Sequence, residues 1–185
     1  MYSETQRQCL LEIARTTIEL SVRNNTCTLH QIETNDETLL HPSGNFVTLT
    51  LNDNLRGCIG SIEGNGALIQ SVAEHAWSAA FKDPRFPPVS IHELEKLCIS
   101  ISILTPKEIL PFSTEAELLE SLKPGVDGLL IEKGMKRSTF LPSVWESISS
   151  PIQFLQQLKL KAGMSPDDIP ERAWRYTAIS ISNKN

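Results

Sequence analysis

The residues best placed to carry out chemistry lie in one hexapeptide, Leu55-Arg56-Gly57-Cys58-Ile59-Gly60. The hexapeptide follows an alternating apolar stretch and a short turn, so we expect it to form a strand. Side chains of a strand alternate between its two faces, which places Arg56 and Cys58 on one face and directs Leu55 and Ile59 into the core. A positive neighbour favours the thiolate, which is the reactive form of cysteine. The pattern therefore predicts a thiol beside a fixed positive charge.

Two interpretations of this strand stay open. Cys58 is either a nucleophilic or redox-active thiol, or a small buried hydrophobic residue, as free cysteines often are. A competent nucleophile usually has a base nearby, and the sequence shows none beside Cys58. Gly57 and Gly60 either offer backbone amides to an anion or leave space for the close approach of another element.

Two loops carry further candidate residues. Asp83-Pro84-Arg85-Phe86-Pro87-Pro88 cannot lie inside a helix, because proline lacks the backbone donor and blocks the preceding turn. The planar guanidinium of Arg85 suits a carboxylate or a phosphate, and the alternative is an ion pair with Asp83 inside the loop. Asp127 lies before Gly128 in a second loop. It could act as an acid or a base, but the Asp-Gly dipeptide favours a turn.

Composition limits the class of protein. The chain has 185 residues, 40% of them hydrophobic, which is enough for a substantial core. The net charge of -5 argues against a broad nucleic-acid surface, so we expect no DNA partner. No apolar run approaches the roughly 20 residues that cross a bilayer, and the first residues lack the pattern of a signal peptide. We therefore expect a cytoplasmic protein that does not enter the membrane.

The cysteines and histidines do not assign a cofactor. The four cysteines form no CxxC pair, and no histidine lies at metal-finger spacing. In a chain of this length without a secretion signal, free thiols are the expectation. The sequence assigns no metal and leaves the cofactor unknown.

The remaining pattern predicts an α+β fold, with an antiparallel sheet flanked by helices. Helices are expected over about residues 5–24, 68–81 and 114–122, in a short segment after Ser90, and from Ser150 to a stop at Gly163. Strands are expected at 46–51, in the hexapeptide, at 99–103, on either side of Lys133-Gly134, and as one final strand from Trp174 to Ser182. The stretch from Asn25 to His41 is expected to be irregular.

Several blocks together resemble the AMMECR domain family, also called protein A of the AmmeMemoRadiSam system. The blocks occur in the family's order, and the hexapeptide around Cys58 is the most specific of them. They are Phe46-Val47-Thr48-Leu49, the hexapeptide, Asp83-Pro84-Arg85-Phe86, Ile103-Leu104-Thr105, Pro124-Gly125-Val126-Asp127-Gly128-Leu129 and Thr139-Phe140-Leu141-Pro142. One departure is the turn at residues 52–54, where the family often carries glycine.

The resemblance implies a single α+β domain over residues 1–185, with a larger and a smaller lobe and a cleft that contains the hexapeptide. It also implies a genomic association with a Memo-like protein and a radical SAM protein, and it supplies no established reaction.

Two functional hypotheses follow from the residues and the resemblance together. The first is an enzyme that uses the Cys58 thiol, with Arg56 as electrostatic support, on a small-molecule or macromolecular substrate oriented by Arg85 or Asp83. The second is a non-catalytic module that binds a small ligand, a peptide or a partner segment in the same cleft. In either case the binding residues are predicted to be Gly57, Gly60, Asp83, Arg85 and Asp127.

Overall fold

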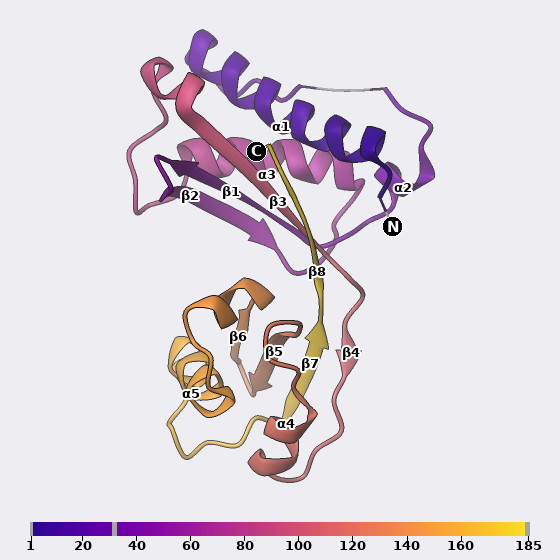
Figure 1. Ribbon diagram of the computed structural model, residues 1–185, viewed down its shortest axis with the longest axis vertical. Helices are drawn as coiled ribbons and strands as arrows, with labels where there is room; N and C mark the ends of the chain where they lie inside the picture. Colours follow the sequence, from indigo (N-terminus) through magenta and orange to yellow (C-terminus); the bar gives the residue numbers. More distant parts are fainter. Residues whose placement is uncertain (1, 31–32, 184–185) are drawn as a thin grey trace. The chain divides into compact units, whose positions relative to one another are not determined.

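The computed structural model describes residues 2–30 and 33–183, and it divides the chain into two compact units. Unit 1 comprises Met1–Leu104 and Ile179–Asn185, and unit 2 comprises Thr105–Ala178. Each unit combines helices with an antiparallel four-stranded sheet (Figure 1). The expected α+β class is confirmed, although the single expected sheet is replaced by two. That residues 1–185 fold as one cooperative domain stays a prediction.

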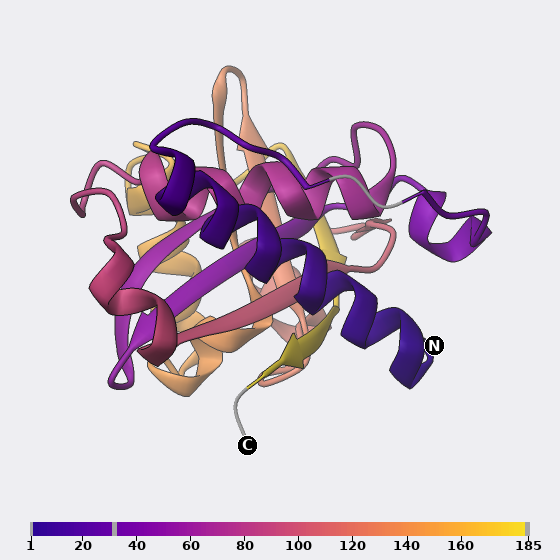
Figure 2. The same ribbon diagram turned by 90° about the horizontal axis from the view of Figure 1, so that it is seen from above.

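Unit 1 is a sheet covered on one face by two helices. The strands lie in the order β2-β1-β3-β8, with β1 at Asn45–Leu51, β2 at Asn54–Ser61, β3 at Leu97–Leu104 and β8 at Ala178–Ser182. The helices are α1, Glu4–Asn24, and α3, Leu68–Phe81. Figure 2 shows both helices running across the same side of the sheet.

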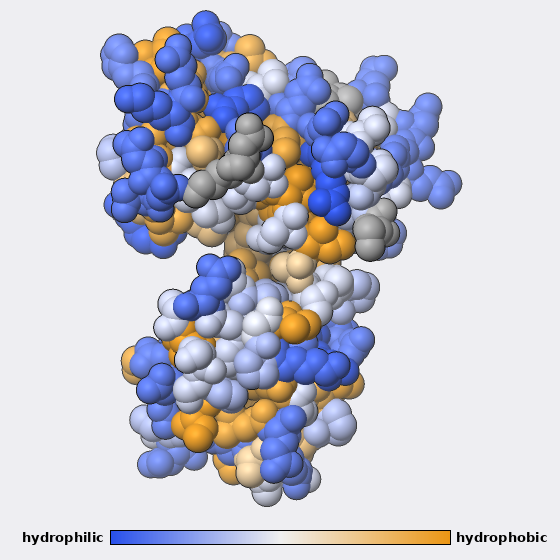
Figure 3. All heavy atoms as spheres, in the orientation of Figure 1, coloured by the Kyte–Doolittle hydropathy of each residue, from blue (hydrophilic) through white to orange (hydrophobic). Residues whose placement is uncertain are grey.

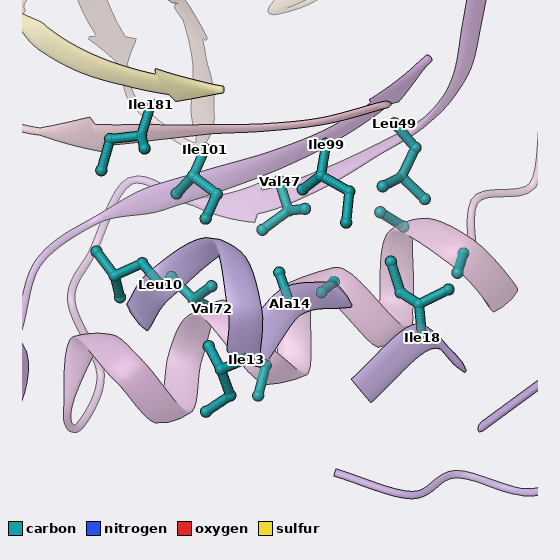
Figure 4. Close-up of a cluster of buried hydrophobic side chains, with 14 of the residues drawn as sticks. Leu10, Ile13, Ala14, Ile18, Val47, Leu49, Val72, Ile99, Ile101 and Ile181 are labelled. Atoms are coloured by element: carbon teal, nitrogen blue, oxygen red, sulfur yellow. The ribbon is translucent and has the colours of Figure 1, made fainter. Parts of the chain in front are cut away.

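The core of unit 1 forms where the alternating apolar residues of the strands meet the apolar residues at helical spacing on the helices. Val47, Leu49, Ile99 and Ile101 alternate along β1 and β3 toward the helices, and all four are buried. Residues at helical spacing on α1 and α3 meet them, as Figure 4 shows for Leu10, Ile13, Ala14, Ile18 and Val72. The opposite pattern leaves Thr48, Ser100 and Ser102 on the other face of the sheet, where they are half-buried.

Capping residues set the ends of α1 as the sequence predicts. The Ser3 hydroxyl accepts a hydrogen bond from Gln6 N, the Gln6 side chain accepts one from Ser3 N, and Asn25 ends the helix in the left-handed conformation. The following stretch is less irregular than expected, because Asp36 caps a short helix α2, Glu37–Leu40. Residues 31–32 of this stretch lie outside the described part of the chain.

Unit 2 holds a second sheet, in the order β4-β7-β5-β6. Its strands are β4, Glu108–Ile109; β5, Gly128–Lys133; β6, Lys136–Phe140; and β7, Arg172–Tyr176. The helices α4, Glu115–Ser121, and α5, Pro151–Lys161, and the 3-10 helix η2, Pro142–Glu146, complete the unit. Its core is centred on Trp145 stacked on Phe154, with ring centroids 3.8 Å apart.

The expected final strand from Trp174 to Ser182 is wrong, because the chain forms two strands there. β7 pairs with β5 in unit 2, whereas β8 joins β3 in the sheet of unit 1. Thr177 lies between them, and its carbonyl and amide bond to Thr105 instead of continuing either ladder. The alternating pattern runs through this break, so periodicity alone does not reveal it.

The visible surface is mainly hydrophilic (Figure 3), as expected when apolar side chains are buried in the cores of the units. In the view of Figure 3, hydrophilic residues dominate and hydrophobic ones form smaller patches between them. None of the helices in the described part of the chain is both long and apolar enough to span a bilayer.

Candidate functional site

The hexapeptide forms most of β2, the edge strand of the sheet in unit 1, and it contains an irregularity. Gly57 pairs with Leu49 of β1, but the next pair is Leu55 with Thr50, so Arg56 is an extra residue in a β-bulge. Strict alternation therefore fails at Arg56. Leu55 is 43% exposed and does not enter the core, which corrects the expectation, whereas Ile59 packs against the core as expected.

Arg56 turns toward the segment that follows Lys82. Its Nε and Nη2 donate to the two carboxylate oxygens of Glu93, at 2.6 and 3.3 Å, and Nη2 also donates to the Pro88 carbonyl at 3.2 Å. Arg56 is 8% exposed, and its Nη1 has no hydrogen-bond partner among the described residues. The bond from Arg56 lowers the pKa of Glu93 from its ordinary value to about 2. The charge of Arg56 is thus engaged by Glu93, which the sequence analysis had not included in the site.

The Cys58 thiol lies on the face of the sheet away from α1 and α3. Cys58 pairs with Thr48 of β1, and the Cys58 Sγ and Thr48 Oγ1 atoms are 3.2 Å apart, within hydrogen-bond range. The residue is half-buried and forms no disulfide. Within residues 2–30 and 33–183, no imidazole or carboxylate makes a hydrogen bond to the sulfur. The contact is therefore with a hydroxyl group, which can donate to a thiolate.

Asp83 links the backbone of Cys58 to Arg85. The Asp83 Oδ2 atom accepts from Cys58 N at 2.9 Å, on the open edge of β2. The same carboxylate accepts from Arg85 Nε at 2.9 Å and from Arg85 Nη2 at 2.6 Å. Hydrogen bonds from Arg85 hold the pKa of Asp83 well below its usual range. Asp83 is 4% exposed, so this carboxylate is a fixed, ionised element of the structure.

Arg85 presents the free part of its guanidinium to solvent. Its side chain is 53% exposed although two of its nitrogens are held by Asp83. Nη1 makes no hydrogen bond with any described residue. The hydrogen bonds that Arg85 donates to Asp83 raise the pKa of Arg85. The positive group linked to Cys58 through Asp83 is consequently Arg85, and the intraloop ion pair considered in the sequence analysis exists as well.

The glycines of the hexapeptide serve close packing. A side chain at Gly57 would collide with the Ala79 carbonyl of α3, and one at Gly60 would collide with Asn45 and Phe46 of β1. Of the two interpretations of Gly57, the one that leaves space for a helix is therefore present in the structure. Its use as an anion ligand stays untested.

Asp127 belongs to unit 2, where it closes a turn. Its Oδ2 accepts from Lys123 N at 2.9 Å, and its carbonyl accepts from the Trp145 indole at 2.7 Å. It is 3% exposed and borders a pocket of about 420 Å³ together with Tyr176, whose pKa is raised to about 12 by burial. The turn interpretation explains these bonds.

The described residues offer no preformed metal site. No group of three or more His, Cys, Asp or Glu side chains comes together in residues 2–30 and 33–183. The candidate site instead combines a thiol, a hydroxyl and a partly free guanidinium. Such a set suits a ligand that has an anionic group and an atom able to react with sulfur.

Fold and site define a class of α+β proteins with two small antiparallel sheets and a thiol on the edge strand of the larger unit. The sequence profile of the AMMECR1 family matches residues 11–181, and the chain belongs to this family. A protein from Methanothermobacter thermautotrophicus is 37% identical over 184 residues, which cover 95% of this chain and 93% of that protein. Protein MJ0810 from Methanocaldococcus jannaschii is 44% identical over 139 residues, 74% of this chain and 69% of its own.

A solved structure confirms the fold. The crystal structure of uncharacterized protein PH0010 from Pyrococcus horikoshii matches with a TM-score of 0.83 and 32% sequence identity, covering 95% of this chain and 90% of that one. The names of these relatives state no activity, so the function is inferred from the site.

Proposed function

We propose that this protein is a cytoplasmic, thiol-dependent enzyme in which Cys58 is the nucleophile and Arg85 binds an anionic group of the substrate. The observation that carries the proposal is the Asp83 carboxylate, which holds both the Cys58 amide and the Arg85 guanidinium. The backbone of Cys58 and the guanidinium of Arg85 are thereby held by one buried residue. Fixed geometry of this kind is what positioning of a substrate requires.

The chemistry follows from the groups present. The Cys58 sulfur attacks an electrophilic carbon, a sulfur–carbon bond forms, and the bond to the leaving group breaks with its electron pair. The Thr48 hydroxyl donates to the thiolate before attack. The proton of the thiol goes to solvent, because none of the described residues is a base hydrogen-bonded to the sulfur. Arg56, which the sequence analysis assigned to electrostatic support, becomes a positioning residue that holds the loop through Glu93 and Pro88.

One specific observation favours the alternative function, a non-catalytic binding module. Among the described residues, the sulfur is hydrogen-bonded to a hydroxyl and to no general base, whereas activated nucleophiles usually have one. In that case Arg85 and the backbone of β2 bind a small molecule or a peptide without turnover. In either case we propose that the family association extends to function, so that a Memo-like protein or a radical SAM protein supplies or consumes the ligand.

Alkylation of the native protein separates the two functions. If Cys58 is a nucleophile, iodoacetamide modifies it before Cys9, Cys27 and Cys98, as followed by peptide mass spectrometry over time. Cys58→Ser should abolish the fast phase and leave the melting temperature nearly unchanged. Protection of Cys58 until the protein is denatured would leave the enzyme without its nucleophile and would favour the binding module.

A further inference from the structure

A pocket of about 550 Å³ lies in unit 1, apart from the thiol. It is bordered by the C-terminal ends of α1 and α3 and by the segment 88–91, which Figures 1 and 2 both show on the same side of the unit. We call it the Trp77 pocket. Its volume lies within the range of about 300–1,000 Å³ that is typical of small-molecule sites. Neither Cys58 nor Arg85 borders it.

The walls of the Trp77 pocket are apolar and partly aromatic. Trp77 and Phe81 stack on one turn of α3, with ring centroids 6.1 Å apart, and both border the pocket. Val89 and Ile91 contribute from the opposite segment, and Ile91 is 52% exposed. A flat apolar body that enters the pocket would cover aromatic surface that is now accessible to water.

The opening of the pocket is positively charged. Arg23 and Lys82 are both exposed, and they border it from the ends of α1 and α3. Neither makes an ion pair with a described residue, and the Nζ atom of Lys82 lies 5.3 Å from the Trp77 ring centroid. None of the described residues that border the pocket is acidic. The charges therefore complement an anion.

The pocket wall is already fixed in the structure. The Pro88 carbonyl is held by Arg56, and Val89 N donates to the Ala80 carbonyl at 2.9 Å. Three prolines between residues 84 and 88 restrict the same segment further. A preformed wall reduces the entropy that binding must overcome.

We propose that the Trp77 pocket binds a small organic anion with an aromatic body and one carboxylate. The aromatic body lies against Trp77 and Phe81, and the carboxylate lies between Lys82 and Arg23. This site is separate from the proposed reaction at Cys58 and does not depend on it.

The probe for this test is 1-naphthoate, with the neutral 1-naphthalenemethanol as its matched analogue, both titrated calorimetrically into the full chain. The Kd of naphthoate should lie below about 1 mM and should be at least about tenfold lower than the Kd of the alcohol. Arg23→Gln combined with Lys82→Gln should weaken naphthoate about tenfold and leave the alcohol unchanged. Lys96→Gln removes an exposed charge of the same unit outside the pocket and should change neither affinity.

A second readout locates the ligand independently of charge. Cys27 is exposed and borders the pocket, so saturating naphthoate should slow its alkylation several-fold while Cys98 reacts at an unchanged rate. Cys58→Ser should bind naphthoate like the wild type. The proposal would be overturned if naphthoate and the alcohol bound with equal Kd, or if the Kd of naphthoate exceeded about 1 mM. It would also be overturned if Lys96→Gln weakened naphthoate as much as the double variant does, or if naphthoate did not slow the alkylation of Cys27.

Discussion

The Asp83 carboxylate is the residue on which the two halves of the candidate site depend. It is buried, yet four hydrogen bonds, from the Cys58 and Arg85 amides and from two Arg85 side-chain nitrogens, satisfy it as an anion. Buried carboxylates are stable when they are paired in this way. The result is a guanidinium held at a fixed place beside the Cys58 backbone, and its Nη1 makes no hydrogen bond within the described part of the chain.

A second ionised carboxylate, Glu93, makes folding sensitive to acid. Its pKa in the folded protein is lowered to about 2, first by the bond from Arg56, so the unfolded chain binds the proton more tightly. The stabilisation that ionised Glu93 gives the folded protein is therefore complete above the pKa of the unfolded chain, about 4.5, and it is lost as the pH falls toward 2.

We expect the Glu93→Gln variant to lack this component, which is on the order of 2–3 kcal/mol once the shift is discounted for screening by solvent at this partly exposed side chain. Urea unfolding between pH 6 and pH 2 should show the wild type and the variant converging in stability as the pH falls. Glu95→Gln, at a neighbouring exposed position, is the control and should follow the wild type. A constant difference between Glu93→Gln and wild type across this range would contradict the account.

At the scale of elements, the edge strand β2 is held on two sides. Gly57 lies directly against the Ala79 carbonyl of α3, and the open edge is covered by Asp83 through its bond to Cys58 N. Both contacts fix the backbone on either side of the thiol. An edge strand covered in this manner is also protected from pairing with another chain.

The contact between β2 and α3 predicts a large effect of one methyl group. Gly57→Ala would require the helix or the strand to move, and we expect it to destabilise the protein by about 3 kcal/mol or more. Gly134→Ala at the hairpin tip has open space around it but a positive φ, and it should cost about 1 kcal/mol. Chemical denaturation of both variants measures the difference. Equal losses would show that β2 and α3 are not in close contact.

The sequence analysis locates this strand correctly but misses its irregularity. Alternation correctly predicts the first hairpin and the packing of Ile59 against the core, because the periodicity of apolar residues reflects their burial. It fails at Arg56, since a bulge inserts a residue without changing the apolar pattern. Ser90 and Glu93 have the spacing of a capping box, and the Glu93 carboxylate accepts from the Ser90 amide and hydroxyl. Its partner Arg56 lies 37 residues away, and no local spacing reveals such a contact.

At the scale of the whole molecule, the chain leaves unit 1 after Leu104 and returns to it at Ile179. β8 is the returning strand, and Ile181 is buried in the core of unit 1. Unit 1 is therefore complete only when the C-terminal strand has followed unit 2. The sequence resemblance predicted two lobes, but the break at Thr177 that divides the final strand between them carries no signal of its own.

This connectivity leads us to expect one cooperative unfolding transition. Calorimetry should give a single peak whose calorimetric and van't Hoff enthalpies agree. Limited proteolysis should release no stable fragment that corresponds to unit 1 or unit 2. Replacing Ile181 with Asp should lower the stability of the whole molecule. Two separate transitions, or a stable excised fragment, would show that the units fold independently.

The central claim is that Arg85 guides an anion to the Cys58 sulfur. It is tested most directly in a chain in which Cys9, Cys27 and Cys98 are replaced by serine. The ratio of the alkylation rates by iodoacetate and iodoacetamide cancels the reactivity of the thiol itself and reports on attraction of the negative reagent. Arg85→Gln should lower this ratio several-fold, and Arg85→Lys, which keeps the charge, should retain most of it. An unchanged ratio in Arg85→Gln, or equal losses in both variants, would contradict the account.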